Sequence, residues 1–267
     1  MTGIEHEETE KIVVLGIGIN GCEAVNRMIE RKTEGVEFVI AAENEHVLDS
    51  CMAAKKFSVN AIQDCKKFFD DNFHDTDMIF IVSISGSCEA EKNFALNTAR
   101  AAKTSGALTL GIPVKTENDM QSFKDDFDSV IISCADDSKP YMIVEGITGM
   151  ITKASYVNID FPDVTAILHD TGTAYFVTGY AEGMNRSEKV MRKIMDIHGN
   201  NIRPAKSILM NITTSADVTL SELNDTAEEM LEHILDSNAS LIWCHTIDDD
   251  MNDGMKVTAV FGMNDKD

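Results

Sequence analysis

The sequence has little proline and no closely paired cysteines. It holds 4 prolines and 6 cysteines in 267 residues, and no two cysteines have CxxC spacing. The stretch from Met1 to Lys11 is acidic and lacks the apolar core of a secretory signal. Scattered cysteines without a leader are typical of proteins kept in a reducing compartment. We therefore predict a cytoplasmic location.

Long hydrophobic runs and positive charge are also scarce. The longest apolar runs, such as Ile12–Gly18 and Met78–Ile84, are strand-sized and too short to cross a bilayer. Lys and Arg number 23 against 45 Asp and Glu, a net charge of −22, which repels nucleic acid and anionic lipid. The seven histidines form no HxxxH or His/Cys cluster. We predict no nucleic-acid partner, no direct membrane binding and no metal site.

In the first half of the chain, short apolar runs alternate with helical periodicity. Lys11–Leu15 predicts a strand, and the spacing of apolar residues in Glu23–Arg31 predicts a helix. Further strands are predicted at Val36–Ala42, Asp77–Ser83, Ala107–Pro113 and Asp128–Cys134, with a helix at Phe94–Lys103. Strands separated by helices indicate βαβ units and a parallel sheet. We predict an α/β fold whose Rossmann-like nucleotide-binding domain spans residues 11–135.

After residue 135 the pattern changes. We predict a shortened connecting helix within residues 136–156 and a smaller α/β domain with a mixed sheet over residues 157–263. Its predicted helices are Val164–His169, Ser187–Ile197 and one from Thr219, which forms a capping box with Glu222, to Leu235. Its predicted strands are Thr173–Thr178, Ala205–Ile212 and a pair formed by Ala239–His245 with Met255–Phe261.

The clearest local motif is a glycine turn between the first strand and the first helix. Gly16, Gly18 and Gly21 form a GxGxxG pattern, which lets the backbone approach a phosphate at a helix N-terminus. Glu43 follows the second strand, where NAD enzymes place a ribose-binding acid. A Rossmann-type NAD-binding protein is therefore one alternative. Another is that the glycines serve only a tight strand-to-helix turn.

Longer stretches carry a family resemblance. IVVLGIGINGCEAVNRMIE, GVEFVIAAEN and DMIFIVSISGS in the first half resemble the FtsZ branch of the tubulin/FtsZ family in order and spacing. VNIDFPDVTAIL, KSILMNITTSADVTLSEL and DDDMNDGMKVTAVFGM are similar to its synergy loop, C-terminal strands and hairpin. The resemblance runs from about Ile12 to Met263. It implies a GTP-binding cytoskeletal fold whose subunits stack head to tail.

The resemblance also implies the site residues. The nucleotide would lie against Gly16, Gly18, Asn20, Gly21, Asn44, Ser85, Gly86 and Ser87. The catalytic positions of the synergy loop would be Asn158, Asp160 and Asp163, which reach the nucleotide of the next subunit. The alternative for the two aspartates is a purely structural role as caps of the following helix.

Several positions depart from the family pattern. Glu89 and Glu91 follow the loop at Ser85–Ser87, and would face phosphate with like charge. Ile19 and Cys22 replace glycines of the first turn, and the part of the connecting helix that holds guanine is missing. We therefore predict a degraded GTP site with weak or absent GTPase, in which Mg²⁺ binds only if GTP or GDP does. The alternative is a working, filament-forming GTPase.

The two faces of such a subunit would not be equivalent. The synergy-loop face keeps its acidic residues, whereas the nucleotide face is altered. We therefore expect self-association, or association with a functional FtsZ, through the synergy-loop face. The short end at Met263–Asp267 lacks the linker and recognition peptide by which the family reaches membrane anchors. This is a second reason to expect no membrane binding.

Overall fold

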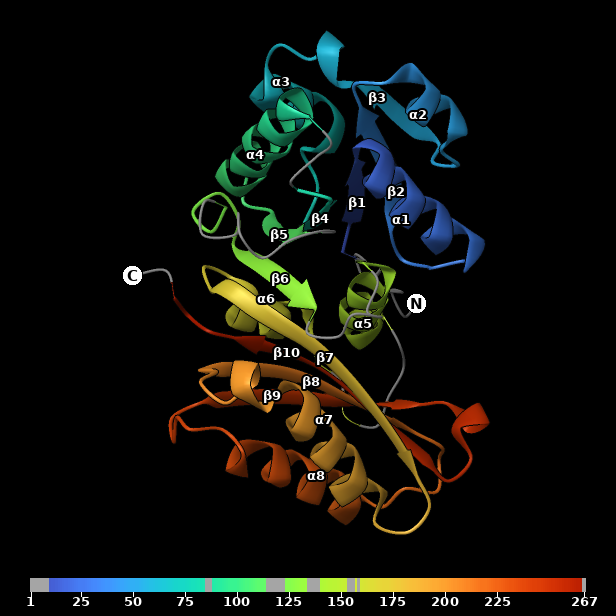
Figure 1. Ribbon diagram of the computed structural model, residues 1–267, viewed down its shortest axis with the longest axis vertical. Coiled ribbons are helices and arrows are strands. Elements are labelled where there is room, and N and C mark those ends of the chain that lie inside the picture. The colour runs from blue at the N-terminus through green and yellow to red at the C-terminus, as the bar shows by residue number, and fades with distance from the viewer. Residues whose placement is uncertain are drawn as a thin grey trace, which may run out of the picture.

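The fold is built on one mixed β-sheet. The computed structural model describes residues 10–84, 88–113, 123–133, 140–152, 157 and 159–265. Within them, ten strands lie in the order β3-β2-β1-β4-β5-β6-β7-β10-β8-β9 (Figure 1). The strands are β1 (Ile12–Ile17), β2 (Glu37–Ala42), β3 (Lys55–Ser58), β4 (Met78–Val82), β5 (Leu108–Ile112), β6 (Ser129–Ser133), β7 (Gly172–Glu182), β8 (Ser207–Thr214), β9 (Ser240–Ile247) and β10 (Gly254–Gly262).

Helices cover both faces of this sheet. They are α1 (Gly18–Glu30), α2 (Glu45–Ser50), α3 (Cys65–Phe73), α4 (Glu89–Thr104), α5 (Pro140–Thr152), α6 (Phe161–Leu168), α7 (Arg186–Ile202) and α8 (Leu220–Glu232), with the short 3-10 turns η1 (Val59–Ala61) and η3 (Asp249–Met251). Buried residues of α1, α5 and α6 share one apolar cluster. Residues of α3 and α4 form a second cluster, and α7 with α8 cover a third.

The N-terminal half confirms the predicted parallel sheet. β1 pairs in parallel with β2 and with β4, and the pairing continues through β5 to β6. All six residues of β1 are buried. A strand covered by helices on both faces is expected to be continuously apolar, as IVVLGI is. The first βα turn therefore lies at the carboxyl edge of a rigid sheet.

The two halves share a seam. β7 pairs in parallel with β6 on one side and antiparallel with β10 on the other, so the sheet continues from one half into the next. The predicted pairing of Ala239–His245 with Met255–Phe261 is wrong, because β8 lies between β9 and β10. Alternating apolar residues identify strands but do not fix their order across a sheet.

The helix α8 begins with half of the predicted capping box. The Thr219 side chain accepts a hydrogen bond from the Glu222 N–H, at 3.1 Å. The Glu222 carboxylate turns away to pair with Arg186 of α7, at 2.7 and 3.0 Å. A buried arginine needs a partner more than an exposed helix end does, which explains the difference.

The connecting helix α5 lies against the C-terminal sheet. A Cβ on Gly146 would come within 2.9 Å of the Phe176 ring, so glycine permits this close approach. At its other side, Glu145 accepts two hydrogen bonds from Arg31 at the end of α1, at 3.0 and 3.1 Å. This contact raises the Arg31 pKa. The remainder of the predicted connector, residues 136–139 and 153–156, lies outside the described residues.

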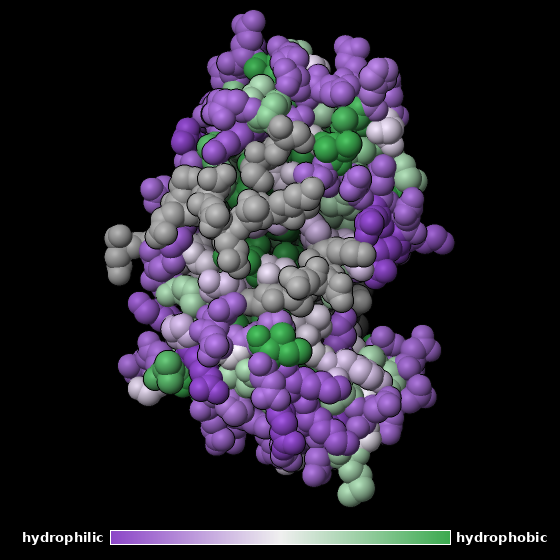
Figure 2. All heavy atoms as spheres, viewed as in Figure 1, coloured by the Kyte–Doolittle hydropathy of each residue, from purple (hydrophilic) through white to green (hydrophobic). Residues whose placement is uncertain are grey.

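The visible surface is largely polar. Hydrophilic side chains cover most of the face in Figure 2, and apolar groups show in scattered patches, some of them in the hollow between the two halves. Among the described residues, no helix combines the length and apolarity needed to cross a membrane.

Candidate functional site

The glycine turn has the close geometry that its motif predicts. β1 ends at Ile17 and α1 begins at Gly18, which has a φ of +63°. A Cβ on Gly16 would come within 2.6 Å of the Gly21 carbonyl oxygen, and one on Gly21 within 2.6 Å of the Gly16 carbonyl carbon. Gly16 and Gly21 therefore touch backbone to backbone. Because α1 follows β1 directly, the N–H groups of its first turn lie at the carboxyl edge of the sheet.

The space next to Gly18 is taken by a carboxylate. A Cβ on Gly18 would lie 2.8 Å from Cδ and 3.0 Å from Oε1 of Glu91. Glu91 lies in the first turn of α4 and is only 3% exposed. Its Oε1 accepts a hydrogen bond from the Glu43 N–H at 3.1 Å. Glu91 thus joins the glycine turn to the end of β2.

A second carboxylate lies close by. The Cys88 thiol donates to Glu43 Oε2 at 2.9 Å. That hydrogen bond is the main reason why the Cys88 pKa is raised, and burial is the second. The thiol therefore stays protonated at neutral pH. The edge that a phosphate would approach therefore carries two acids, Glu43 and Glu91.

The other predicted nucleotide residues are placed as follows. Asn20 is half-buried in the first turn of α1. Asn44 serves as the N-cap of α2, where its side chain accepts from the His46 N–H at 2.9 Å. Ser85, Gly86 and Ser87 lie outside the described residues. Cys22 is buried in α1, and burial together with the neighbouring Cys51 raises its pKa to about 11.

The predicted synergy loop leads into α6. Asp160 and Asp163 form a complete capping box at its start, with Pro162 in the first turn. Both side chains are polar groups near the surface, and Asp160 is exposed. Just before them, Val157 bridges to β9, where it accepts from the His245 N–H at 3.1 Å. Asn158 lies outside the described residues.

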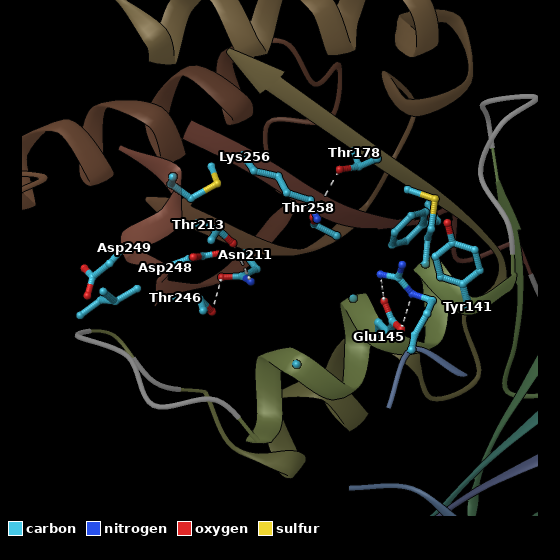
Figure 3. Close-up of a pocket in the computed structure, with 17 residues that line it drawn as sticks. Tyr141, Glu145, Thr178, Asn211, Thr213, Thr246, Asp248, Asp249, Lys256 and Thr258 are labelled. Carbon is cyan, nitrogen blue, oxygen red and sulfur yellow. Dashed lines mark hydrogen bonds and ion pairs between the residues drawn. The ribbon is translucent and has the colours of Figure 1, made fainter. Parts of the chain in front are cut away.

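A polar cavity that no motif in the sequence predicts lies between α5 and the C-terminal sheet. Its volume is about 730 Å³. Figure 3 shows Tyr141 and Glu145 on one wall and Asp248 and Asp249 at the opposite rim. Its floor is made of side chains from β7 to β10, among them Thr178, Thr258, Asn211, Thr213, Thr246 and Lys256.

Strand registers explain this polar floor. Thr258 stands opposite Thr178 on one side and opposite Asn211 on the other. In the neighbouring row, Lys256 stands opposite Thr213, which pairs with Thr246. The signal in the sequence was the alternation of polar with apolar residues along β8 and β10, but it is usable only once these strands are known to be neighbours.

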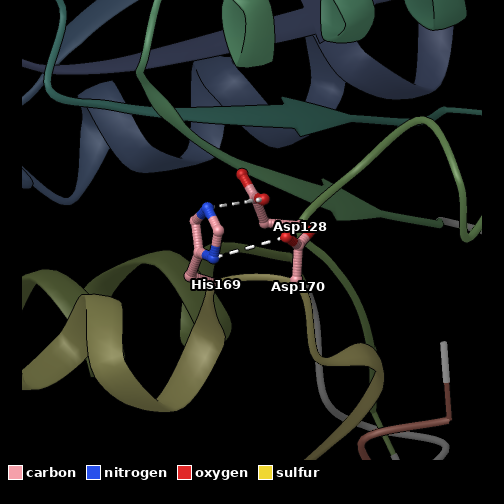
Figure 4. A group of neighbouring side chains, drawn as sticks. All are labelled: Asp128, His169 and Asp170. Atoms are coloured by element: carbon pink, nitrogen blue, oxygen red, sulfur yellow. Dashed lines mark ion pairs between the residues drawn. The ribbon is translucent and has the colours of Figure 1, made fainter.

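A charged cluster forms where α4, α6 and β6 meet (Figure 4). His169 Nε2 lies 3.8 Å from Asp128 Oδ1, and His169 Nδ1 lies 3.5 Å from Asp170 Oδ2. These are metal-ligand types, brought together from distant parts of the chain. The Lys103 ammonium lies 3.2 Å from Asp128 and 2.9 Å from Asp170. The protein thus supplies its own cation there, and we interpret the cluster as an ion-pair network.

Comparisons with known proteins agree with this architecture. Residues 172–263 match the family model described as FtsZ family, C-terminal domain. The structure is similar to an FtsZ variant from M. jannaschii, with a TM-score of 0.81 and 21% identity over 95% of this chain and 91% of that chain. An empty FtsZ dimer from M. jannaschii gives 0.79 and 21% over 96% and 89%. CetZ from Methanosaeta thermophila gives 0.63 and 15% over 94% and 86%.

The fold is therefore the one that FtsZ and CetZ share. Residues 172–263 also match the C-terminal domain of the FtsZ family in sequence, so this part of the chain is similar to FtsZ in sequence as well as in fold. The predicted fold class and family resemblance are confirmed. The NAD-binding alternative, which depended on the glycine turn and Glu43, gains no support from these matches.

Proposed function

We propose that this chain is a cytoskeletal or filament-regulating FtsZ-like protein whose own GTP site is degraded, with weak or absent GTPase. The observation that carries the proposal is the position of Glu91. Its buried carboxylate lies against Gly18, in the turn where the resemblance predicts phosphate.

Charge and space both support weak binding. A phosphate brought to this turn would meet Glu91 and Glu43 at short range, where like charges repel strongly because little water screens them. Glu91 also fills the space that the absent Gly18 side chain leaves. Each charge-assisted hydrogen bond lost by a phosphate costs about 1.5–3 kcal/mol. Losing several of them would weaken affinity by orders of magnitude.

Calorimetric titration with GTP and Mg²⁺ tests this proposal directly. A polymerising FtsZ, titrated in the same buffer, is the positive control. We expect little or no heat of binding from this chain at concentrations that saturate the control. Submicromolar binding would overturn the proposal and favour the alternative of a working, filament-forming GTPase, which the intact Gly16–Gly21 contact would then serve.

The second part of the proposal concerns the partner. FtsZ-type subunits associate head to tail, an arrangement that makes open filaments. Asp160 is exposed at the start of α6 and Asp163 lies one turn further on, so this face keeps its acidic groups near the surface. We propose that the chain docks through this face on itself or on a functional FtsZ. A subunit with one altered face would end a filament or change its turnover.

Mixing experiments test the partner. Substoichiometric amounts of this chain are added to polymerising FtsZ, and filament length and GTP turnover are measured. Shorter filaments or altered turnover are the expected results. If neither changes, and the chain alone stays monomeric, the docking proposal is wrong and only the fold remains.

A further inference from the structure

We propose that Glu91 is the residue that determines what the glycine turn accepts: its carboxylate acts as a tethered anion in the place of a bound phosphate. This inference rests on the proposed function and explains it at the level of one side chain. It assigns to this turn a latent site for an inorganic polyphosphate, which substitution of Glu91 would open.

The helix α1 provides the environment for such an anion. The first N–H groups of a helix lack partners within the helix and carry a positive potential of about half a charge. Gly18 lets a ligand approach this end closely because it has no Cβ. The Glu91 carboxylate occupies that approach, with Cδ 2.8 Å from where a Cβ would be.

Burial shows that Glu91 is held in this position. A glutamate side chain is almost never fully buried unless its charge is compensated, yet Glu91 is only 3% exposed. The hydrogen bond from the Glu43 N–H to Oε1 fixes one oxygen. Glu91 thus connects the turn after β1 with the loop after β2. In our proposal a bound phosphate would otherwise contact both of these segments.

Glu89 provides a matched control in the same helical turn. It belongs, like Glu91, to the first turn of α4, but its side chain is exposed. Both acids favour the N-terminus of α4, so either substitution removes one negative charge from that helix end. Only Glu91→Ala also empties the space beside Gly18. Comparing the two variants therefore separates the local role of Glu91 from a general effect of charge.

The experiment is calorimetry of the full chain with inorganic tripolyphosphate at fixed ionic strength. This probe has no base, so the missing guanine contacts do not affect the result. We expect Glu91→Ala to bind at least about tenfold more tightly than Glu89→Ala or the unmodified chain, because a like charge at short range is gone. Tripolyphosphate should also raise the melting temperature of Glu91→Ala and leave that of Glu89→Ala unchanged.

Equal binding by folded Glu91→Ala and Glu89→Ala would overturn the inference. If Glu91→Ala does not fold, Glu91→Gln decides, because it keeps the shape and the acceptor for the Glu43 N–H while removing the charge. It should bind more tightly than Glu89→Gln, and equal affinities would again overturn the inference. Tight GTP binding by the unmodified chain would sink the proposed function instead, and the ratio between the variants would still measure the effect of Glu91.

Discussion

Asp160 and Asp163 hold each other's backbone. The Asp163 N–H donates to Asp160 Oδ1 at 3.0 Å, and the Asp160 N–H donates to Asp163 Oδ2 at 3.1 Å. One oxygen of each carboxylate is therefore committed to starting α6. The structural and catalytic interpretations of this pair do not exclude each other, because each carboxylate keeps a second oxygen.

Substitution at Asp160 separates the two interpretations. Asp160→Ala removes the cap and should lower the free energy of unfolding by about 1 kcal/mol, whereas Asp160→Asn keeps a capping oxygen and should change it little. Urea denaturation measures both. If the unmodified chain changes the GTP turnover of added FtsZ and Asp160→Asn does not, the Asp160 carboxylate acts chemically. An equal stability loss for both variants would contradict the capping role.

The contact between Gly16 and Gly21 predicts a sharp intolerance to side chains. Gly16→Ala places a methyl group 2.6 Å from a carbonyl oxygen and should destabilise the chain by about 1–3 kcal/mol. Gly199→Ala in α7 is the control. A Cβ there would meet the flexible Arg203 side chain first, at 3.4 Å, so the substitution should stabilise the helix by about 0.5–1 kcal/mol. Chemical denaturation of both variants shows whether the signs differ as expected.

Lys103 should be more important for stability than its partly exposed side chain suggests. It compensates Asp128, whose side chain is 2% exposed, and it also contacts Asp170. Lys103→Met should cost about 2–3 kcal/mol, since removing one partner leaves a buried charge. Adding Asp128→Asn should recover part of that loss. Lys66→Met, which breaks an exposed pair with Asp70, should cost much less, and an equal loss in thermal melts would contradict this assignment.

Two buried histidines predict the response to mild acid. Burial lowers the pKa of His198 and of His245 below the ordinary value of about 6.5. Between the lowered pKa and about 6.5 the unfolded chain binds more protons, so stability is complete above this window and is lost as pH falls through it. Each histidine contributes a slope of at most about 1.4 kcal/mol per pH unit.

Urea denaturation from about pH 7.5 to about pH 5 measures this slope. Because protonation also relieves the repulsion of an acidic chain, the unmodified protein is compared with His198→Gln at each pH. The variant should show the shallower loss. Parallel curves would mean that His198 does not contribute.

Features that depend on residues close together in the sequence could be predicted from it. The glycine turn, the parallel strands and the cap at Asp160 follow from local spacing, and each is found where it was expected. The sequence could not predict that the Glu222 carboxylate pairs with Arg186 and leaves the capping box incomplete. Glu222 and Arg186 lie 36 residues apart in sequence and meet only when α7 and α8 pack. The order of β8, β9 and β10 was missed for the same reason.

The candidate site shows the same limit. Because Glu91 follows the loop at Ser85–Ser87 in the sequence, we expected its negative charge to repel a phosphate bound there. That its carboxylate would be buried against Gly18 could not be read from the sequence, since it depends on how α4 lies across the turn. The polar cavity beside α5 also needed strand registers that only the structure provides.

The pairing of β6 with β7 has a consequence for any attempt to dissect the chain. Five residues of β7 take their partners from β6, from Ser129↔Gly172 to Ser133↔Phe176. Cutting the chain between the halves would leave this row of backbone donors and acceptors bare along a largely apolar edge strand, a ready template for aggregation. Isolated halves should therefore be less soluble than the whole, and co-expressed halves should restore one another by closing the sheet.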